Sequence, residues 1–236
     1  WRKDSGGIFR QSEWQTAAVA DEDIALALLF AYKRWGDASY LMEAREIISD
    51  IWEHEVVLAG GEYYLVSSAD SRRGPIDLIN LSYISPATYK IFAQADPAHP
   101  WRLLADSSYR LLFSRAARGS AGIPALPPNW LALNIDTGEV FSAHEYHGDV
   151  GERYGYDAFR IFWRVALDKA WFNDARAERY LASFEPFFSK EWQARAFVSE
   201  YTQGGARITG AGDISTDSAL LSVLSSTDLD LASGVY

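Results

Sequence analysis

Apolar side chains recur every three to four residues along most of the chain, which is the spacing of one face of an α-helix. In residues 20–35 this spacing places Ile24, Leu28 and Trp35 on one face of a helix. Three acidic residues lie in its first turn, where the helix dipole favours negative charge. Residues 39–55 repeat the pattern after a link of only a few residues. The sequence therefore predicts an antiparallel helix pair at this end of the chain.

The same period predicts further helices over residues 86–95, 100–118, 156–172, 175–192 and 216–231. Residues 63–66 favour a short strand, and a Gly/Pro-rich stretch opens a long, mostly non-helical connection over residues 119–147. Loops of this length inside a compact domain are usually functional. We find no exact repeat, so a regular solenoid is not supported. The pattern favours an all-α fold, a closed ring of helix pairs, in one domain over residues 1–236.

Composition narrows the class of protein. With 236 residues and 48% hydrophobic content, the chain can bury one sizeable core. Its net charge is -10 and no basic run occurs, so nucleic acid and anionic lipid are disfavoured partners. No apolar stretch reaches the roughly 20 residues that a membrane helix needs. The first residues do not resemble a signal peptide. We expect a globular monomer that does not insert into membranes.

Aromatic side chains are abundant, with 9 Trp, 13 Tyr and 12 Phe. Flat rings beside carboxylates are typical of carbohydrate sites, although a packed core explains most rings in any protein. His144 and His147 can form a metal-ligand pair or lie in a solvated loop, and we favour the loop. The chain has no Cys, no Gly-rich phosphate loop and no acidic Ca²⁺ loop. We therefore expect neither a metal nor another cofactor.

A stripe of charge marks the helix predicted over residues 156–172. Asp157, Arg160, Arg164 and Asp168 follow one another at i, i+3, i+7 and i+11, which places them on one face. The dipole and the neighbouring Arg160 both favour the ionised form of Asp157, as a general base requires. A capping Asp in a salt-bridged surface stripe explains the same residues. The stripe alone leaves both interpretations open.

Three segments in order resemble glycoside hydrolase family 8, the family of bacterial endoglucanases, xylanases and chitosanases. The segments are AAVADEDIALALLFAYKRW, NLSYISPATY and YGYDAFRIFWRVALDKAWF. The resemblance implies an (α/α)6 toroid with a sugar-binding cleft and hydrolysis with inversion. It also implies that Asp157 is the general base, with Arg160 as its partner and Tyr156 lining the cleft.

The resemblance implies further residues around the sugar. The tyrosine of the family's Asn-x-Ser-Tyr element maps to Tyr83, with Asn80 just upstream. The segment LPPNWLAL is similar to the family's Leu-x-Pro-Asp-Trp stretch, which maps a cleft or structural role to Trp130. Asn129 stands where Asp is common in the family. We expect Tyr83, Asn80 and Trp130 to contact substrate.

Two departures from the family pattern bear on activity. The first Asp of the motif Ala-Ser/Thr-Asp-Ala/Gly-Asp is replaced by Val19, which cannot accept hydrogen bonds from a sugar. Asp21 matches the second Asp and is expected to cap the helix. The resemblance also implies a general acid, a Glu well upstream of Val19. We therefore expect this chain to cover the middle of the family domain and to be incomplete at both ends of the toroid.

The leading interpretation is an inverting endo-β-1,4-glycanase acting on cellulose-type glucan, with xylan or chitosan as other substrates of the same reaction. A catalytically inactive carbohydrate-binding homologue is the alternative that Val19 and the absent acid suggest. A third class, a lyase or isomerase on another α/α toroid, would use a His or Tyr base in place of Asp157. Because polysaccharides lie outside the cytoplasm, we expect export to the periplasm or the medium.

Overall fold

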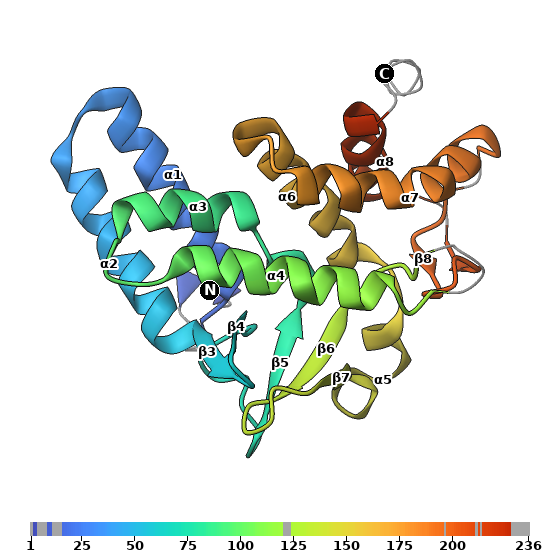
Figure 1. Cartoon of the computed structure of the whole chain (residues 1–236), viewed down its shortest axis with the longest axis horizontal. Coiled ribbons are helices and arrows are strands. Elements are labelled where there is room, and N and C mark those ends of the chain that lie inside the picture. Colours follow the sequence, from blue (N-terminus) through green and yellow to red (C-terminus); the bar gives the residue numbers. More distant parts are fainter. Residues whose placement is uncertain are drawn as a thin grey trace.

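Helices dominate the fold (Figure 1). The computed structural model describes residues 2–3, 9–10, 16–119, 124–195, 197–210, 212 and 214–227. Its helices are α1 (Ala18–Trp35), α2 (Ala38–Glu55), the 3-10 helix η1 (Leu81–Tyr83), α3 (Pro86–Ala95), α4 (Trp101–Ala116), α5 (His144–Glu152), α6 (Tyr156–Phe172), α7 (Ala175–Gln193) and α8 (Ile214–Thr227).

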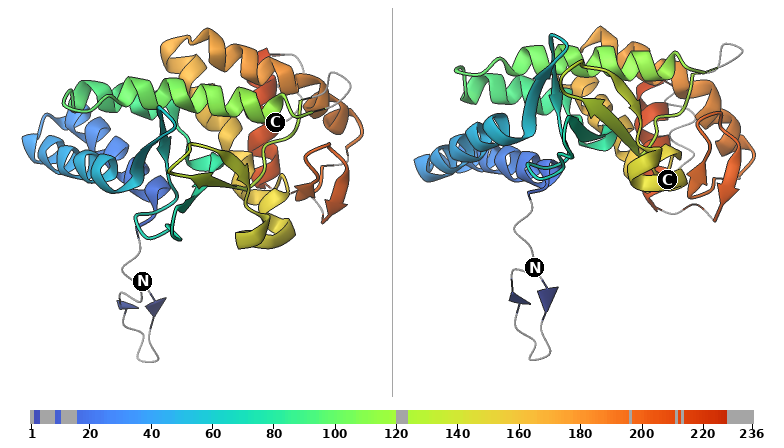
Figure 2. Two further views of the ribbon diagram at one scale, coloured as in Figure 1. Left: turned by 60° about the horizontal axis from the view of Figure 1, so that its bottom comes forward. Right: turned by 90° about the horizontal axis from the view of Figure 1, so that it is seen from below.

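Four small antiparallel sheets accompany the helices. The strands are β1 (Arg2–Lys3), β2 (Phe9–Arg10), β3 (Val56–Ala59), β4 (Glu62–Leu65), β5 (Ile76–Asn80), β6 (Trp130–Asn134), β7 (Val140–Ser142), β8 (Glu200–Tyr201) and β9 (Arg207–Thr209). β1 pairs with β2, β3 with β4 and β8 with β9, and β5, β6 and β7 form one three-stranded sheet in that order. The β1–β2 hairpin stands away from the helical body (Figure 2). No helix in the described part of the chain combines the length and apolar character needed to cross a membrane.

The helices are arranged as packed neighbours on either side of α3 and α4. α1 packs on α2, α3 packs on α4, and α6, α7 and α8 contact one another. α3 also contacts both α1 and α6, so it joins the two groups (Figure 1). Most aromatic rings belong to the core, as predicted, because further rings pack partly buried against the fully buried ones. The fully buried rings are Trp101, Tyr89, Tyr109, Tyr154, Tyr180, Tyr201, Phe92, Phe159, Phe162, Phe184 and Phe188.

The predicted helices are confirmed, with bounds that differ by a few residues. α3 and α6 cover residues 86–95 and 156–172 as predicted, because a proline at the start of α3 and an Asn173 in the left-handed conformation after α6 are local signals. The predicted strand over residues 63–66 is β4, shifted by one residue. α8 covers most of the range predicted over residues 216–231, whose last four residues lie outside the described part of the chain.

The buried face of α1 differs from the predicted one. Ile24 is 51% exposed and Trp35 is 68% exposed. The helix instead buries Ala18, Glu22, Ala25 and Leu29. Apolar residues surround most of this helix, so periodicity alone does not choose the face, and the small Ala side chains let neighbouring helices approach closely. α2 buries the apolar face that its period predicts: Ala44, Ile48 and Ile51 are buried, and Leu41, Ile47 and Trp52 pack partly buried against the core.

The connection predicted to be mostly non-helical contains β6, β7 and α5. β6 was missed because Leu131, Ala132 and Leu133 are all buried, so the strand lacks the alternation that marks a half-exposed strand. α5 was missed because it has nine residues and is interrupted by Gly148, whose φ of 58° and ψ of −157° are not helical.

Candidate active site

The candidate site forms where the β5–β6 sheet meets the start of α6. In the sheet Asn80, the last residue of β5, pairs with Trp130, the first residue of β6. η1 follows β5 directly and contacts α6. This register therefore brings Tyr83, at the end of η1, to the ring of Trp130, with 6.2 Å between ring centroids in an edge-to-face arrangement.

Asp157 is held by a donor on each carboxylate oxygen. Its Oδ1 accepts a hydrogen bond from Arg160 at 2.8 Å, and its Oδ2 accepts one from the indole N–H of Trp130 at 3.2 Å. Both side chains of the Asp157–Arg160 pair are 30% exposed, so water can reach the carboxylate. Asp157 also lies in the first turn of α6, where backbone N–H groups favour negative charge. The arrangement orients the carboxylate and leaves it accessible to solvent.

Asn129 fixes the start of α6 against β6. Its Oδ1 accepts a hydrogen bond from the backbone N–H of Ala158 at 3.0 Å, and its Nδ2 donates to the carbonyl of Val150 at 3.0 Å. The side chain is a helix cap supplied from another part of the chain, since the N-cap residue itself, Gly155, has no side chain to do this. Asn129 therefore positions Asp157 without contacting it.

Tyr83 and His147 complete the surroundings of the carboxylate. The guanidinium of Arg160 lies 5.6 Å from the ring centroid of Tyr83. Burial, and then the negative charge of Asp157, raise the pKa of Tyr83, so its hydroxyl remains a hydrogen-bond donor. His147 stacks on Trp130 with 4.3 Å between centroids. Burial lowers the pKa of His147 although Asp157 opposes this, which favours a neutral imidazole.

Tyr156 and Asn80 lie at opposite extremes of exposure. Tyr156 is 69% exposed at the first position of α6 and is free to contact a ligand. Asn80 is only 1% exposed, and its Oδ1 accepts hydrogen bonds from the backbone N–H and the hydroxyl of Ser82. Asn80 thus caps η1, the turn that carries Tyr83. These hydrogen bonds give Asn80 a positioning role, and the substrate contact expected of it stays a prediction.

The predicted charge stripe does not continue along α6. Arg164 is 1% exposed and donates to Asp23 of α1 at 3.0 Å. Asp168 is fully buried and pairs with Lys90 of α3 at 2.7 Å. The prediction that these charges pair with one another holds only for Asp157 and Arg160, because tertiary neighbours supply closer partners for the rest.

The start of α1 carries a second group of carboxyls. Val19, partly buried, lies in the first turn, and Asp21 follows it. Burial raises the pKa of Asp21, while a hydrogen bond with the backbone of Ala17 lowers it. The prediction that Asp21 caps the helix is wrong, because the N-cap of α1 is Ala17 and Asp21 lies within the first turn. Burial, and then the neighbouring Asp21, raise the pKa of Glu55 to about 7.

Sequence reasoning missed two features of the site. His147 was considered only as a possible ligand beside His144, but it stacks on Trp130 instead, so the two do not form a ligand pair. The role of Asn129 depends on the segment before α6 lying against β6, which local sequence does not reveal. The one sequence signal that could have indicated a role for Asn129 at the site is its position next to Trp130.

Comparison with known proteins decides the family. A model of the family "Glycosyl hydrolases family 8" matches residues 1–233. The chain belongs to glycosyl hydrolase family 8. Endoglucanase A of Acetivibrio thermocellus is 35% identical over 196 residues, which cover 82% of this chain and 38% of that protein. The chain spans between 38% and 48% of the length of the first curated relatives that it matches.

Solved structures share the fold of this family 8 chain. The apo structure of a β-1,3-1,4-glucanase from Paenibacillus sp. X4 has a TM-score of 0.84 at 21% identity, and the match covers 96% of this chain and 61% of that one. A cold-adapted family 8 xylanase, solved with substrate, has a TM-score of 0.75 at 23% identity, covering 99% of this chain and 59% of that one. The predicted all-α (α/α)6 toroid is confirmed as the fold.

Proposed function

We propose that the protein hydrolyses β-1,4-linked glucan chains internally and with inversion, and that Asp157 activates the attacking water. The observation that carries this proposal is the partly exposed carboxylate of Asp157, held by Arg160 and Trp130 in the first turn of α6 of a family 8 chain. Tyr83 and the exposed Tyr156 supply aromatic surface and hydroxyl groups for the sugar beside it.

In this mechanism Asp157 takes one proton from a water molecule. The water oxygen attacks the anomeric carbon on the face opposite the glycosidic oxygen, and a general acid protonates that oxygen as its bond to the anomeric carbon breaks. Acid and base lie roughly 6.5–9.5 Å apart in such enzymes, which leaves room for the water. Among the described residues we assign no general acid. We infer that the general acid is the Glu that the family pattern has upstream of the position of Val19.

Two alternatives remain specific enough to test. Val19, in place of the motif's first Asp, favours a homologue that binds carbohydrate without turnover. Xylan is an alternative substrate, since a family 8 xylanase shares the fold. We further propose that the protein is exported, because the polysaccharide that it would hydrolyse lies outside the cytoplasm. We also propose that it acts as a monomer.

A reducing-sugar assay of the full-length protein on carboxymethyl cellulose, xylan and chitosan tests the proposal. We expect activity on the glucan and a loss of about 10²- to 10⁴-fold in kcat for Asp157→Asn. Asp136→Asn is the matched control, since Asp136 is exposed in the β6–β7 turn at the other end of the sheet. NMR of the first product should show the α-anomer, as inversion of a β-linkage requires.

The remaining outcomes separate the alternatives. Activity that Asp157→Asn leaves intact would exclude Asp157 as the base. Activity that appears only in Val19→Asp would identify an inactive homologue. An initial β-anomer would exclude inversion.

A further inference from the structure

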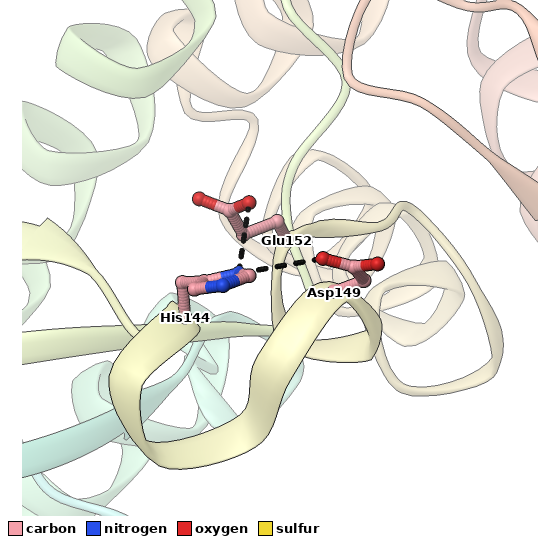
Figure 3. Close-up of side chains that lie close together, drawn as sticks. All are labelled: His144, Asp149 and Glu152. Carbon is pink, nitrogen blue, oxygen red and sulfur yellow. Dashed lines mark ion pairs between the residues drawn. The ribbon is translucent and has the colours of Figure 1, made fainter.

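Three potential metal ligands converge on one side of α5. His144 is the first residue of this helix, and Asp149 and Glu152 follow near its end. Figure 3 shows the imidazole of His144 joined by ion pairs to both carboxylates. The Nδ1 of His144 lies 3.5 Å from an oxygen of Asp149 and 3.5 Å from an oxygen of Glu152. One donor atom from each residue lies within 4.8 Å of the others.

The interruption of α5 brings these side chains together. In a continuous helix a residue at i+5 is rotated by about 140° from residue i, so Asp149 would point away from His144. Gly148 lies between them with φ of 58° and ψ of −157°, a conformation that residues with a side chain rarely adopt. The turn at Gly148 therefore moves Asp149 onto the side of the helix that carries His144.

The distances suit a shared ion better than direct hydrogen bonds. An N–H···O hydrogen bond spans roughly 2.7–3.2 Å between its heavy atoms, and both separations from His144 exceed this. Two ligands of a tetrahedral Zn²⁺, each about 2.0–2.2 Å from the metal, lie about 3.3–3.5 Å apart. The two separations of 3.5 Å, which are those of loose ion pairs, equal the two edges of a zinc tetrahedron that meet at His144, and all three donor atoms lie within 4.8 Å of one another.

Local charge favours a cation at the same point. The cluster combines two carboxylates with one imidazole, and the nearby Arg153 already pairs with Glu200 at 2.7 Å. The second oxygen of Glu152 accepts a hydrogen bond from the hydroxyl of Ser142, which orients the carboxylate as an outer partner orients a metal ligand. Without an ion, both carboxylates share a single imidazole as their ion-pair partner.

Space for further ligands lies beside the cluster. A cavity of about 370 Å³ is lined by Asp149, Glu152, Arg153, Thr202, Gln203 and Ile208. The side chains of His144, Asp149 and Glu152 are 59%, 75% and 42% exposed, so an ion can enter without any rearrangement. Three protein ligands with an open fourth position are typical of zinc sites that keep a bound water.

We propose that His144, Asp149 and Glu152 bind one divalent transition-metal ion of the zinc type, with water completing its coordination. One nitrogen and two carboxylate oxygens suit Zn²⁺ better than Ca²⁺ or Mg²⁺, which prefer oxygen ligands alone. The ion would clamp the two ends of α5 to each other. His147 lies on this helix and stacks on Trp130, so the ion would also fix one wall of the candidate active site.

Isothermal titration calorimetry of the chelator-treated protein with Zn²⁺ alone, in a buffer that does not bind zinc, tests this proposal. We expect close to one ion per chain, and an affinity that falls at least about tenfold in His144→Ala and in Asp149→Asn, since even removal of an outer partner costs that much. His54→Ala is the matched control, because His54 is an exposed histidine on α2. It should bind zinc as the native protein does.

A thermal melt guards against a folding defect. Without metal, Asp149→Asn and the native protein should melt at the same temperature, and Zn²⁺ should raise the melting temperature of the native protein and His54→Ala only. The proposal would be overturned if the native protein did not bind Zn²⁺. It would also be overturned if His144→Ala and Asp149→Asn bound Zn²⁺ with the affinity of the native protein. Neither measurement uses catalysis, so the result is independent of the proposed hydrolysis.

Discussion

The hydrogen bond from Trp130 to Asp157 offers a direct test of how the candidate base is positioned. Trp130→Phe removes the indole N–H that donates to the Oδ2 of Asp157 at 3.2 Å. It retains an aromatic ring that can pack on His147 and Tyr83. The substitution therefore removes the donor and disturbs the packing little.

The size of the effect follows from the geometry. A hydrogen bond to a charged group contributes roughly 1.5–3 kcal/mol. The bond to Asp157 is long, its carboxylate is 30% exposed and Arg160 still holds the other oxygen, so we expect about 1–1.5 kcal/mol of lost orientation. If all of this appears in the transition state, kcat falls by about five- to twelvefold.

The assay is kcat of the full-length protein on the substrate found by the reducing-sugar screen. Trp171→Phe is the control, because Trp171 is 43% exposed on the last turn of α6, away from Asp157. Its ring centroid lies 5.7 Å from that of Phe30. We expect the control to keep native kcat, and both variants to keep the native melting temperature. If Trp130→Phe folds normally and turns over at the native rate, the indole does not position the base.

Two further predictions concern stability. Lys90→Met removes the cation that lies 2.7 Å from the fully buried Asp168, so it should lower the free energy of unfolding, measured by urea denaturation, by about 3–5 kcal/mol. Lys33→Met, at an exposed lysine, should change this free energy little, and similar losses in both variants would contradict the role of the buried pair. Burial and Asp21 raise the pKa of Glu55 from 4.5 to about 7, so its contribution to stability is complete below pH 4.5 and is lost as pH rises through 7. The shift corresponds to at most about 3 kcal/mol, and the carboxyl lines a cavity that admits water, so Glu55→Gln should stabilise the protein by about 1–2 kcal/mol at pH 8 and not at pH 4. Thermal melts at the two pH values measure this, and equal effects at both would exclude the shifted carboxyl.

The sequence by itself determined most of the helices and the proximity of Asp157 to Arg160. The bounds of α3 and α6 follow from local apolar period and from the residues that begin and end each helix. The pairing of Asp157 with Arg160 follows from their i, i+3 spacing, which a helix converts into proximity whatever surrounds it. The family pattern then identified the pair as a candidate site before any tertiary contact was known.

Tertiary structure decided what local spacing leaves open. Arg164 and Asp168 share a face with Asp157 in sequence, but contacts with α1 and α3 draw them into separate ion pairs. The sheet register brings Trp130 to Tyr83, the cap that Asn129 supplies to α6 brings Trp130 to Asp157, and the turn at Gly148 brings Asp149 to His144. Each of these depends on segments meeting across the fold, or on a backbone conformation that interrupts the helical period. A pattern of neighbouring residues therefore predicts the elements, and only their packing determines which side chains meet.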